Sequence, residues 1–196
     1  MESFTAWTHA LWDHEMLPLQ WGAVIGASLG AAVFDLGSRR IPNFLTGPLF
    51  VSGLMWALMM GHWAGLVDGI VGSVLLAFPF LVLFVLAGGG AGDAKLMGAV
   101  GMWLGVLNSS VVLASVTLSG TILAVGFALL KGRFKAALEN LASFSRAILF
   151  FLFGRRKWND AQALLPQVND MQTIPYGIAI FVGVCLAAGG LCLWRG

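Results

Sequence analysis

The chain has 196 residues, of which 59% are hydrophobic and only 10% are charged, and its mean hydropathy is +0.88. This composition excludes a water-soluble globular domain and predicts a membrane protein. The net charge is only +2, and the basic residues flank apolar runs. We therefore expect the chain to contact membrane lipid and no nucleic acid.

Apolar runs long enough to cross a bilayer recur along the whole chain. The hydrocarbon core is about 30 Å thick and requires about 20 apolar residues per helix. The clearest runs are Leu17–Gly37, Phe44–Met60, Ala64–Ala87 and Ile174–Trp194. No basic stretch of the kind that begins a cleaved signal peptide precedes the first run, so we expect that run to stay in the mature protein.

A further run, Leu96–Leu130, is too long for a single crossing. At about 1.5 Å per residue, one straight helix would extend well beyond the hydrocarbon core. Gly105 and the polar stretch Asn108–Ser110 offer a turn, so we expect two limbs, the first of them short. The chain, residues 1–196, is therefore predicted to form one all-α integral membrane domain with about six transmembrane helices.

Positive charges fall on one side of this six-helix arrangement. Of the 11 Lys and Arg residues, all except Arg195 lie on the same face. Because Lys and Arg are retained in the cytoplasm, that face is predicted to be cytoplasmic, and the protein is expected to be multi-pass in the inner membrane. Segment 131–173 carries apolar residues at helical spacing and is predicted to be an amphipathic helix on the cytoplasmic surface.

Two aspartates fall at the cytoplasmic ends of predicted spans. Asp35 lies in "AAVFDLGSRRIPN", and Asp93 follows the glycines of "GGGAGDAKL". Carboxylates at membrane depth are costly unless they are paired or hydrated, so both are candidates for function. Two adjacent carboxyl groups do not both ionise cheaply, which leaves one as an acid and the other as a base. Such a pair can hydrolyse a peptide bond without a metal or any other cofactor.

Simpler roles stay open for both aspartates on residue chemistry alone. Asp35 and Arg39 are four residues apart and suit an interfacial ion pair, and Asp93 suits an N-cap that follows a plain glycine turn. On the functional interpretation, Gly90 and Gly92 let an extended substrate backbone approach Asp93.

Three separated segments resemble the type IV prepilin peptidases, which are membrane aspartic proteases of the GxGD type. The first is Asp35 with "RRIPN" (39–43), the second is "GAGD" (90–93) with "AKLMGAVGMWLG", and the third is "IPYGIAI" (174–180). The resemblance implies that Asp35 and Asp93 are the catalytic pair. It also implies a prepilin or pseudopilin substrate, with a basic leader and an apolar helix, that is cut at the cytoplasmic face.

Larger members of that family carry a cytoplasmic insert with a cysteine tetrad and methylate the new N-terminus. The two cysteines of this chain, Cys185 and Cys192, both lie in the last predicted span. The resemblance therefore implies cleavage without methyltransferase activity. It is greatest to the small peptidases of Flp, or tight-adherence, pilus systems.

The other motif residues are expected to bind substrate or to shape the site. Lys95 also suits a membrane anchor whose amine snorkels to the surface, and Asn43 suits a cap of the second helix. Pro42 and Pro175 are suited to the entry of helices. Tyr176 could line the cleft or act as an interfacial anchor. The full set is Gly90, Gly92, Lys95, Pro42, Asn43, Pro175, Tyr176 and Gly177.

A small transporter or scaffold is the alternative to a protease. It would use Asp35 and Asp93 as a proton relay or as an ion-pair site. A relay is expected to leave polar groups at several depths, whereas these spans are almost bare of them, which favours the protease. In the first span, Gly22, Gly26 and Gly30 recur every four residues and predict a close-packing face. Asp68, near the outer end of the third span, is expected to hold an ordinary interfacial position.

Overall fold

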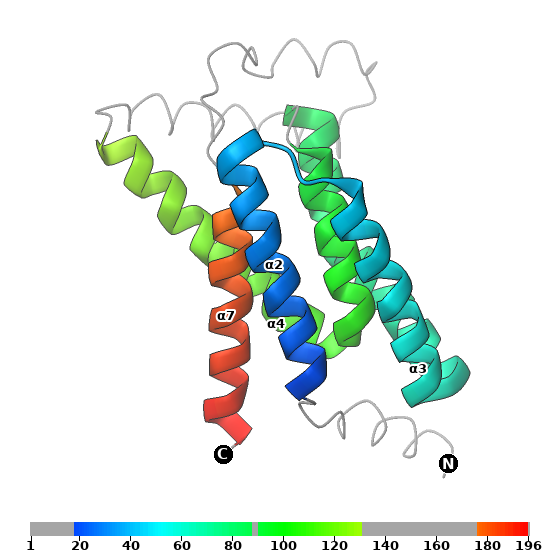
Figure 1. Ribbon diagram of the computed structural model, residues 1–196. Helices are drawn as coiled ribbons and strands as arrows, with labels where there is room; N and C mark the ends of the chain where they lie inside the picture. Colours follow the sequence, from blue (N-terminus) through cyan, green and yellow to red (C-terminus); the bar gives the residue numbers. More distant parts are fainter. Residues whose placement is uncertain (1–17, 88–89, 131–175, 196) are drawn as a thin grey trace, which may run out of the picture.

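The computed structural model describes residues 18–87, 90–130 and 176–195 (Figure 1). Its secondary structure is all α-helical, as predicted. The helices are α2 (Pro18–Ser38), α3 (Asn43–Ala87), α4 (Ala91–Leu130) and α7 (Tyr176–Arg195). All 4 are long and apolar enough to cross a membrane, and the chain is a multi-pass membrane protein. The predicted amphipathic helix at 131–173 and Pro175 lie outside the described residues.

Helix α3 consists of two limbs that meet at His62. The backbone of His62 is non-helical, with φ of 52° and ψ of −139°. A Cβ atom on Gly65 would meet the carbonyl oxygen of Ala57, whereas these residues would be about 12 Å apart in a straight helix. The chain therefore reverses direction between the runs predicted at Phe44–Met60 and Ala64–Ala87, and the two limbs lie side by side in Figure 1.

Helix α4 reverses at Gly105, where φ is +67°, a conformation that favours glycine. The carboxylate of Asp68, in α3, accepts a hydrogen bond from the backbone N–H of Val106 at 3.1 Å. A Cβ atom on Gly105 would overlap that carboxylate. Asp68 therefore caps the second limb of α4. The sequence predicted only an ordinary interfacial position for this residue.

The turn predicted in α4 is correct at Gly105 and wrong at Asn108–Ser110, which is helical. Polar side chains can bond to the preceding helical turn instead of breaking the helix. The side-chain amide of Asn108 donates to the carbonyl oxygen of Leu104 at 3.3 Å, and the hydroxyl of Ser110 donates to that of Leu107 at 2.6 Å. These bonds keep the segment in the second limb.

Glycines bring α3 and α4 into backbone contact. A Cβ atom on Gly101 would lie 2.6 Å from the carbonyl carbon of Gly72, and such close approach is typical of helices that pack within membranes. The predicted packing face is wrong at Gly22 and Gly26, whereas a Cβ atom on Gly30 would be in ordinary contact with Leu45 of α3 at 3.7 Å. Added Cβ atoms on Gly22 and Gly26 would meet nothing within 4 Å, because α2 turns its opposite face to the core.

We expect Gly101→Ala to lower the free energy of unfolding by about 3 kcal/mol, because the added methyl group would meet backbone that cannot move aside. Gly126→Ala, in the same helix, is the matched control, since a Cβ atom there would meet nothing within 4 Å. Thermal unfolding in detergent measures the stability of both variants. Equal stability of the two proteins would contradict the packing described.

The core lies where α4 meets α2, α3 and α7. In Figure 1, α7 runs antiparallel to α2, and part of α4 passes behind them. Large apolar side chains on the outer faces, such as Val74 and Phe78 of α3, are exposed, as contact with lipid requires. The antiparallel arrangement places the end of α2 beside the start of α7. The fully buried core residues include Val24, Leu96, Val100, Val112, Val116, Ile180 and Val184.

Candidate active site

Asp35 lies near the end of α2, beside the first turn of α7. Its Oδ2 atom accepts a hydrogen bond from the backbone N–H of Gly177 at 2.8 Å. An N–H in the first turn of a helix has no partner within that helix, so the carboxylate satisfies it and is held by it. A Cβ atom on Gly177 would lie 2.9 Å from the Cβ atom of Asp35. Glycine is therefore the residue that fits this contact.

Asp93 is the third residue of α4. Its N–H donates to the carbonyl oxygen of Gly90 at 3.1 Å, so Asp93 lies inside the first turn and is not the N-cap. Ile41 lies in the short segment between α2 and α3 and packs against Gly92, the residue before Asp93. The fold thus brings the end of α2, which carries Asp35, beside the start of α4, which carries Asp93, although 57 other residues separate the two aspartates in the sequence.

The glycines before Asp93 make room for neighbouring groups. A Cβ atom on Gly90 would lie 2.8 Å from Oδ2 of Asp93, and one on Gly92 would lie 2.9 Å from Cβ of Ile41. Gly90 therefore leaves space for the carboxylate, and Gly92 lets the chain after α2 pack against α4. The sequence predicted only that these glycines let a substrate backbone approach Asp93, and it did not predict these packing roles.

The segment after Asp35 turns sharply into α3. Arg39 has a φ of 52°, which is uncommon for a residue with a side chain, and its N–H donates to the carbonyl oxygen of Asp35 at 3.0 Å. Pro42 directly precedes α3, and its carbonyl oxygen accepts from the N–H of Leu45 at 3.1 Å. Pro42 therefore lies at the entry of a helix, as its fixed φ angle suits.

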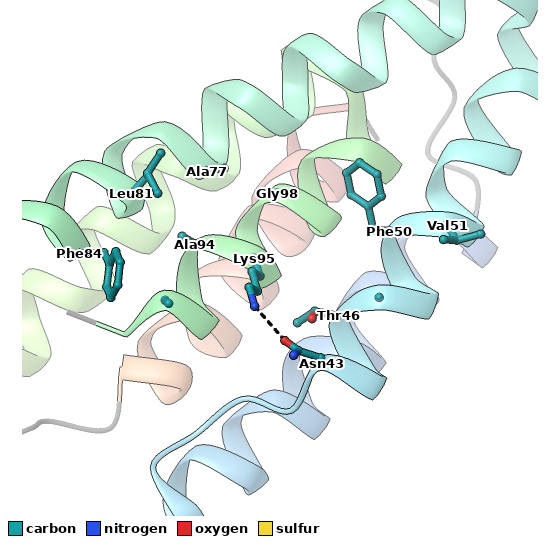
Figure 2. Close-up of a pocket in the computed structure, with 12 residues that line it drawn as sticks. Asn43, Thr46, Phe50, Val51, Ala77, Leu81, Phe84, Ala94, Lys95 and Gly98 are labelled. Carbon is teal, nitrogen blue, oxygen red and sulfur yellow. Dashed lines mark hydrogen bonds between the residues drawn. The ribbon is translucent and has the colours of Figure 1, made fainter. Parts of the chain in front are cut away.

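Asn43 and Lys95 contact each other. The Nζ atom of Lys95 donates to Oδ1 of Asn43 at 3.0 Å, which joins the start of α3 to the first turns of α4 (Figure 2). Asn43 is the first residue of α3 rather than the residue before it. Its side chain therefore accepts a hydrogen bond from Lys95 and does not form the helix cap that was expected. Lys95 follows Asp93 by two residues, and at 3.6 residues per turn these side chains leave α4 on nearly opposite sides.

Tyr176 begins α7 and is half-buried. Its ring packs edge-on against Phe80 with centroids 5.8 Å apart, and its hydroxyl lies where a Cβ atom on Gly120 would be. It directly precedes Gly177, whose N–H binds Asp35. The structure thus places Tyr176 among the helices next to Asp35, and not on a lipid-facing surface.

A set of buried hydrogen bonds that connects three helices was not predicted from the sequence. The side-chain amide of Gln20 donates to the carbonyl oxygen of Trp103, and the indole N–H of Trp103 donates to the carbonyl oxygen of Leu49 at 2.8 Å. These bonds connect α2, α4 and α3. The available signal was Gln20 itself, because an amide inside an apolar span needs a partner.

Three curated relatives are similar to part of the chain, and each is named "Prepilin leader peptidase/N-methyltransferase". The protein of Aeromonas salmonicida (strain A449) is 35% identical over 104 residues, which are 50% of this chain and 35% of the relative. That of Aeromonas hydrophila is 34% identical over 104 residues, 50% of this chain and 36% of the relative. That of Neisseria gonorrhoeae is 31% identical over 120 residues, 57% of this chain and 42% of the relative.

The chain thus spans less than half the length of these relatives. No solved structure gives a significant match. Residues 22–193 match the model of the Type IV leader peptidase family. That match covers most of the chain and includes Asp35, Asp93 and Gly177, so the chain belongs to the type IV leader peptidase family.

Proposed function

We propose that the protein is an aspartic endopeptidase that removes the leader peptide of prepilins at the cytoplasmic face of the inner membrane. The observation that carries this proposal is the placement of Asp35 and Asp93 at the same end of the helices, where the N–H of Gly177 binds Asp35 and Gly92 packs against Ile41. Family membership supports the substrate class. The transporter alternative finds no support in the relatives, which are named as peptidases.

The proposed reaction uses the two carboxyl groups as one acid–base unit. The ionised carboxylate takes a proton from water as the water oxygen attacks the scissile carbonyl carbon, and the protonated carboxyl group donates to the carbonyl oxygen. The C–N bond then breaks as a proton passes to the leaving amine. The N–H of Gly177 keeps Asp35 in one orientation during these transfers, which is the positioning that such chemistry requires.

We also propose that the reversals at His62 and Gly105 divide the helices into six membrane spans, the first limb of α4 being short. The amphipathic helix at 131–173 then lies on the cytoplasmic surface. Reporter fusions at Lys135 and Arg156 are expected to report cytoplasm, and fusions at Asn108 and after Arg195 to report the opposite side, because positive residues stay in the cytoplasm. A cytoplasmic signal at Asn108 would contradict the hairpin in α4.

We propose that the protein cleaves its substrate without methylating the new N-terminus. We also propose that this substrate is a pilin of the Flp type. Support for the first comes from Cys185 and Cys192, which both lie in α7 and do not form the tetrad of the larger enzymes. Support for the second comes from "IPYG" at 174–177. Mass spectrometry of the mature pilin shows whether its new N-terminus carries a methyl group.

The proposed function is tested with the purified full-length protein in detergent and a synthetic prepilin that keeps its leader. We expect a single cut after the leader, unaffected by a chelator, because two carboxyl groups supply all the proton transfers. Loss of cleavage in the chelator with rescue by zinc would contradict the aspartic mechanism. Failure of the well-folded protein to cut any prepilin would favour the transporter.

A further inference from the structure

A groove of about 750 Å³ lies between the two limbs of α3 and the start of α4 (Figure 2). Its walls are apolar and exposed at the outer surface of the helices, where a bilayer supplies the surroundings. Polar side chains lie at one end, where Lys95 donates to Asn43 at 3.0 Å. The groove therefore has one charged end and one apolar end. Its exposed apolar walls include Phe50, Val51, Leu81 and Phe84.

Trp103 of α4 packs against the first limb of α3 next to the part of α3 that lines the groove. The indole N–H donates to the carbonyl oxygen of Leu49 at 2.8 Å, and the ring stacks on Trp56 with centroids 5.5 Å apart. A Cβ atom on Gly53 would lie 2.6 Å from the same ring. Helices α3 and α4 are therefore in direct contact at Gly53, two residues after Val51, the last residue of the first limb that lines the groove.

The groove has the depth of one lipid leaflet. Along α3 it runs from Asn43 to Val51, which is about 12 Å of helix, and half of a bilayer core is about 15 Å. A transmembrane peptide helix needs about 30 Å, which is more than twice the length that the groove covers along α3. One lipid molecule matches the groove better than a membrane-spanning peptide does.

The groove also lies away from the two aspartates. Lys95, Ala94 and Gly98 line it, whereas Asp35 and Asp93 do not, and Asp93 leaves α4 on nearly the opposite side from Lys95. A peptide bond held in the groove is therefore not presented to the carboxyl pair. The groove is a feature separate from the proposed active site.

We propose that this groove binds one anionic phospholipid of the leaflet at the Asp35–Asp93 end of the helices, with its phosphate at Lys95 and an acyl chain along the apolar walls. An ammonium group has three N–H donors. Among the described residues, Asn43 is the acceptor for one of them, and phosphate oxygens form strong bonds to such a cation. The charge at Lys95 thus selects an anionic headgroup over a zwitterionic one.

The test uses full-length protein, freed of lipid in detergent and titrated with phosphatidylglycerol or phosphatidylcholine, with bound lipid counted by native mass spectrometry. We expect the wild type to hold one phosphatidylglycerol about fivefold more tightly than phosphatidylcholine, the effect of one lysine near an anionic lipid. Lys95→Gln is expected to remove this preference. Arg40→Gln removes a charge outside the groove and is expected to keep it.

A second pair of variants tests the apolar part of the groove. Gly47 lines it, and a Cβ atom there would meet nothing within 4 Å, so Gly47→Leu fills space without disturbing the fold. We expect Gly47→Leu to weaken the binding of both lipids. Gly26→Leu is the matched control, because a Cβ atom on Gly26 would also meet nothing within 4 Å and Gly26 lies on α2, outside the groove.

Three results would overturn the proposal. The first is equal affinity of the wild type for the two lipids, and the second is unchanged phosphatidylglycerol binding in both Lys95→Gln and Gly47→Leu. The third comes from a photo-crosslinking amino acid at Val51, in membranes that also contain a prepilin. Crosslinks to lipid support the proposal, and crosslinks to the prepilin mean that the groove belongs to the substrate.

Discussion

Replacing either Asp35 or Asp93 by Asn is expected to abolish leader cleavage in a protein that still inserts and accumulates normally. An amide keeps nearly the shape of a carboxyl group but does not take or give the proton, and such transfers contribute about 10²- to 10⁴-fold to a rate. The surviving aspartate then lacks its partner. Cleavage of a synthetic prepilin by equal amounts of purified wild-type and variant protein measures the loss.

The double variant and a control variant decide whether the two aspartates act as one unit. Residues that act together are strongly non-additive, so Asp35→Asn with Asp93→Asn is expected to be little worse than either single change. Asp68→Asn is expected to stay active, because its side-chain oxygen can still accept from the N–H of Val106. Full activity of a well-expressed Asp93→Asn protein would exclude the proposed mechanism. Loss of folded protein in the single variants would instead indicate a structural ion pair.

Gly177→Ala is expected to lower kcat by about 10²-fold with little change in KM. The added Cβ atom would lie 2.9 Å from the Cβ atom of Asp35, so the carboxylate must move away from the N–H that holds it. A misplacement of about 1 Å costs a reaction about 10²-fold. A change that affects kcat more than KM indicates that the reacting geometry is lost while substrate binding persists.

Two other glycines of α7 separate this effect from a general effect on the helix. A Cβ atom on Gly189 would meet nothing within 4 Å, so Gly189→Ala is expected to leave kcat unchanged. A Cβ atom on Gly183 would lie 2.5 Å from the Cα atom of Val116, and Gly183→Ala is expected to lower the stability of the protein instead. Normal kcat in Gly177→Ala would show that Asp35 does not depend on this contact.

The sequence predicted the helices well because membrane spans are recognised by the length and polarity of a run. The run Leu17–Gly37 became α2 (Pro18–Ser38), and Gly105 marked a reversal inside an otherwise uninterrupted apolar stretch. The candidate site was located in the same way, since a carboxylate is conspicuous in an apolar sequence. Asp35 and Asp93 were therefore identified as candidates from the sequence alone.

Contacts between helices were harder to predict, for a physical reason. A helix that is apolar all round carries no hydrophobic stripe to show which face meets protein and which meets lipid. The stripe of Gly22, Gly26 and Gly30 was therefore assigned to packing, whereas the closest backbone contact lies between Gly72 and Gly101. Pairings such as that of Asn43 with Lys95 depend on how distant segments meet, which a single sequence does not state.

The hydrogen bond from Gly177 to Asp35 has a consequence for the order in which the protein matures. Synthesis proceeds from the N-terminus, so both aspartates are made and inserted well before the start of α7. Asp35 receives its amide partner only when the last helix enters the bilayer. A chain that stalls or is truncated before residue 177 carries both carboxyl groups without the contact that orients one of them. On the proposed function, proteolytic competence therefore waits for the synthesis of α7.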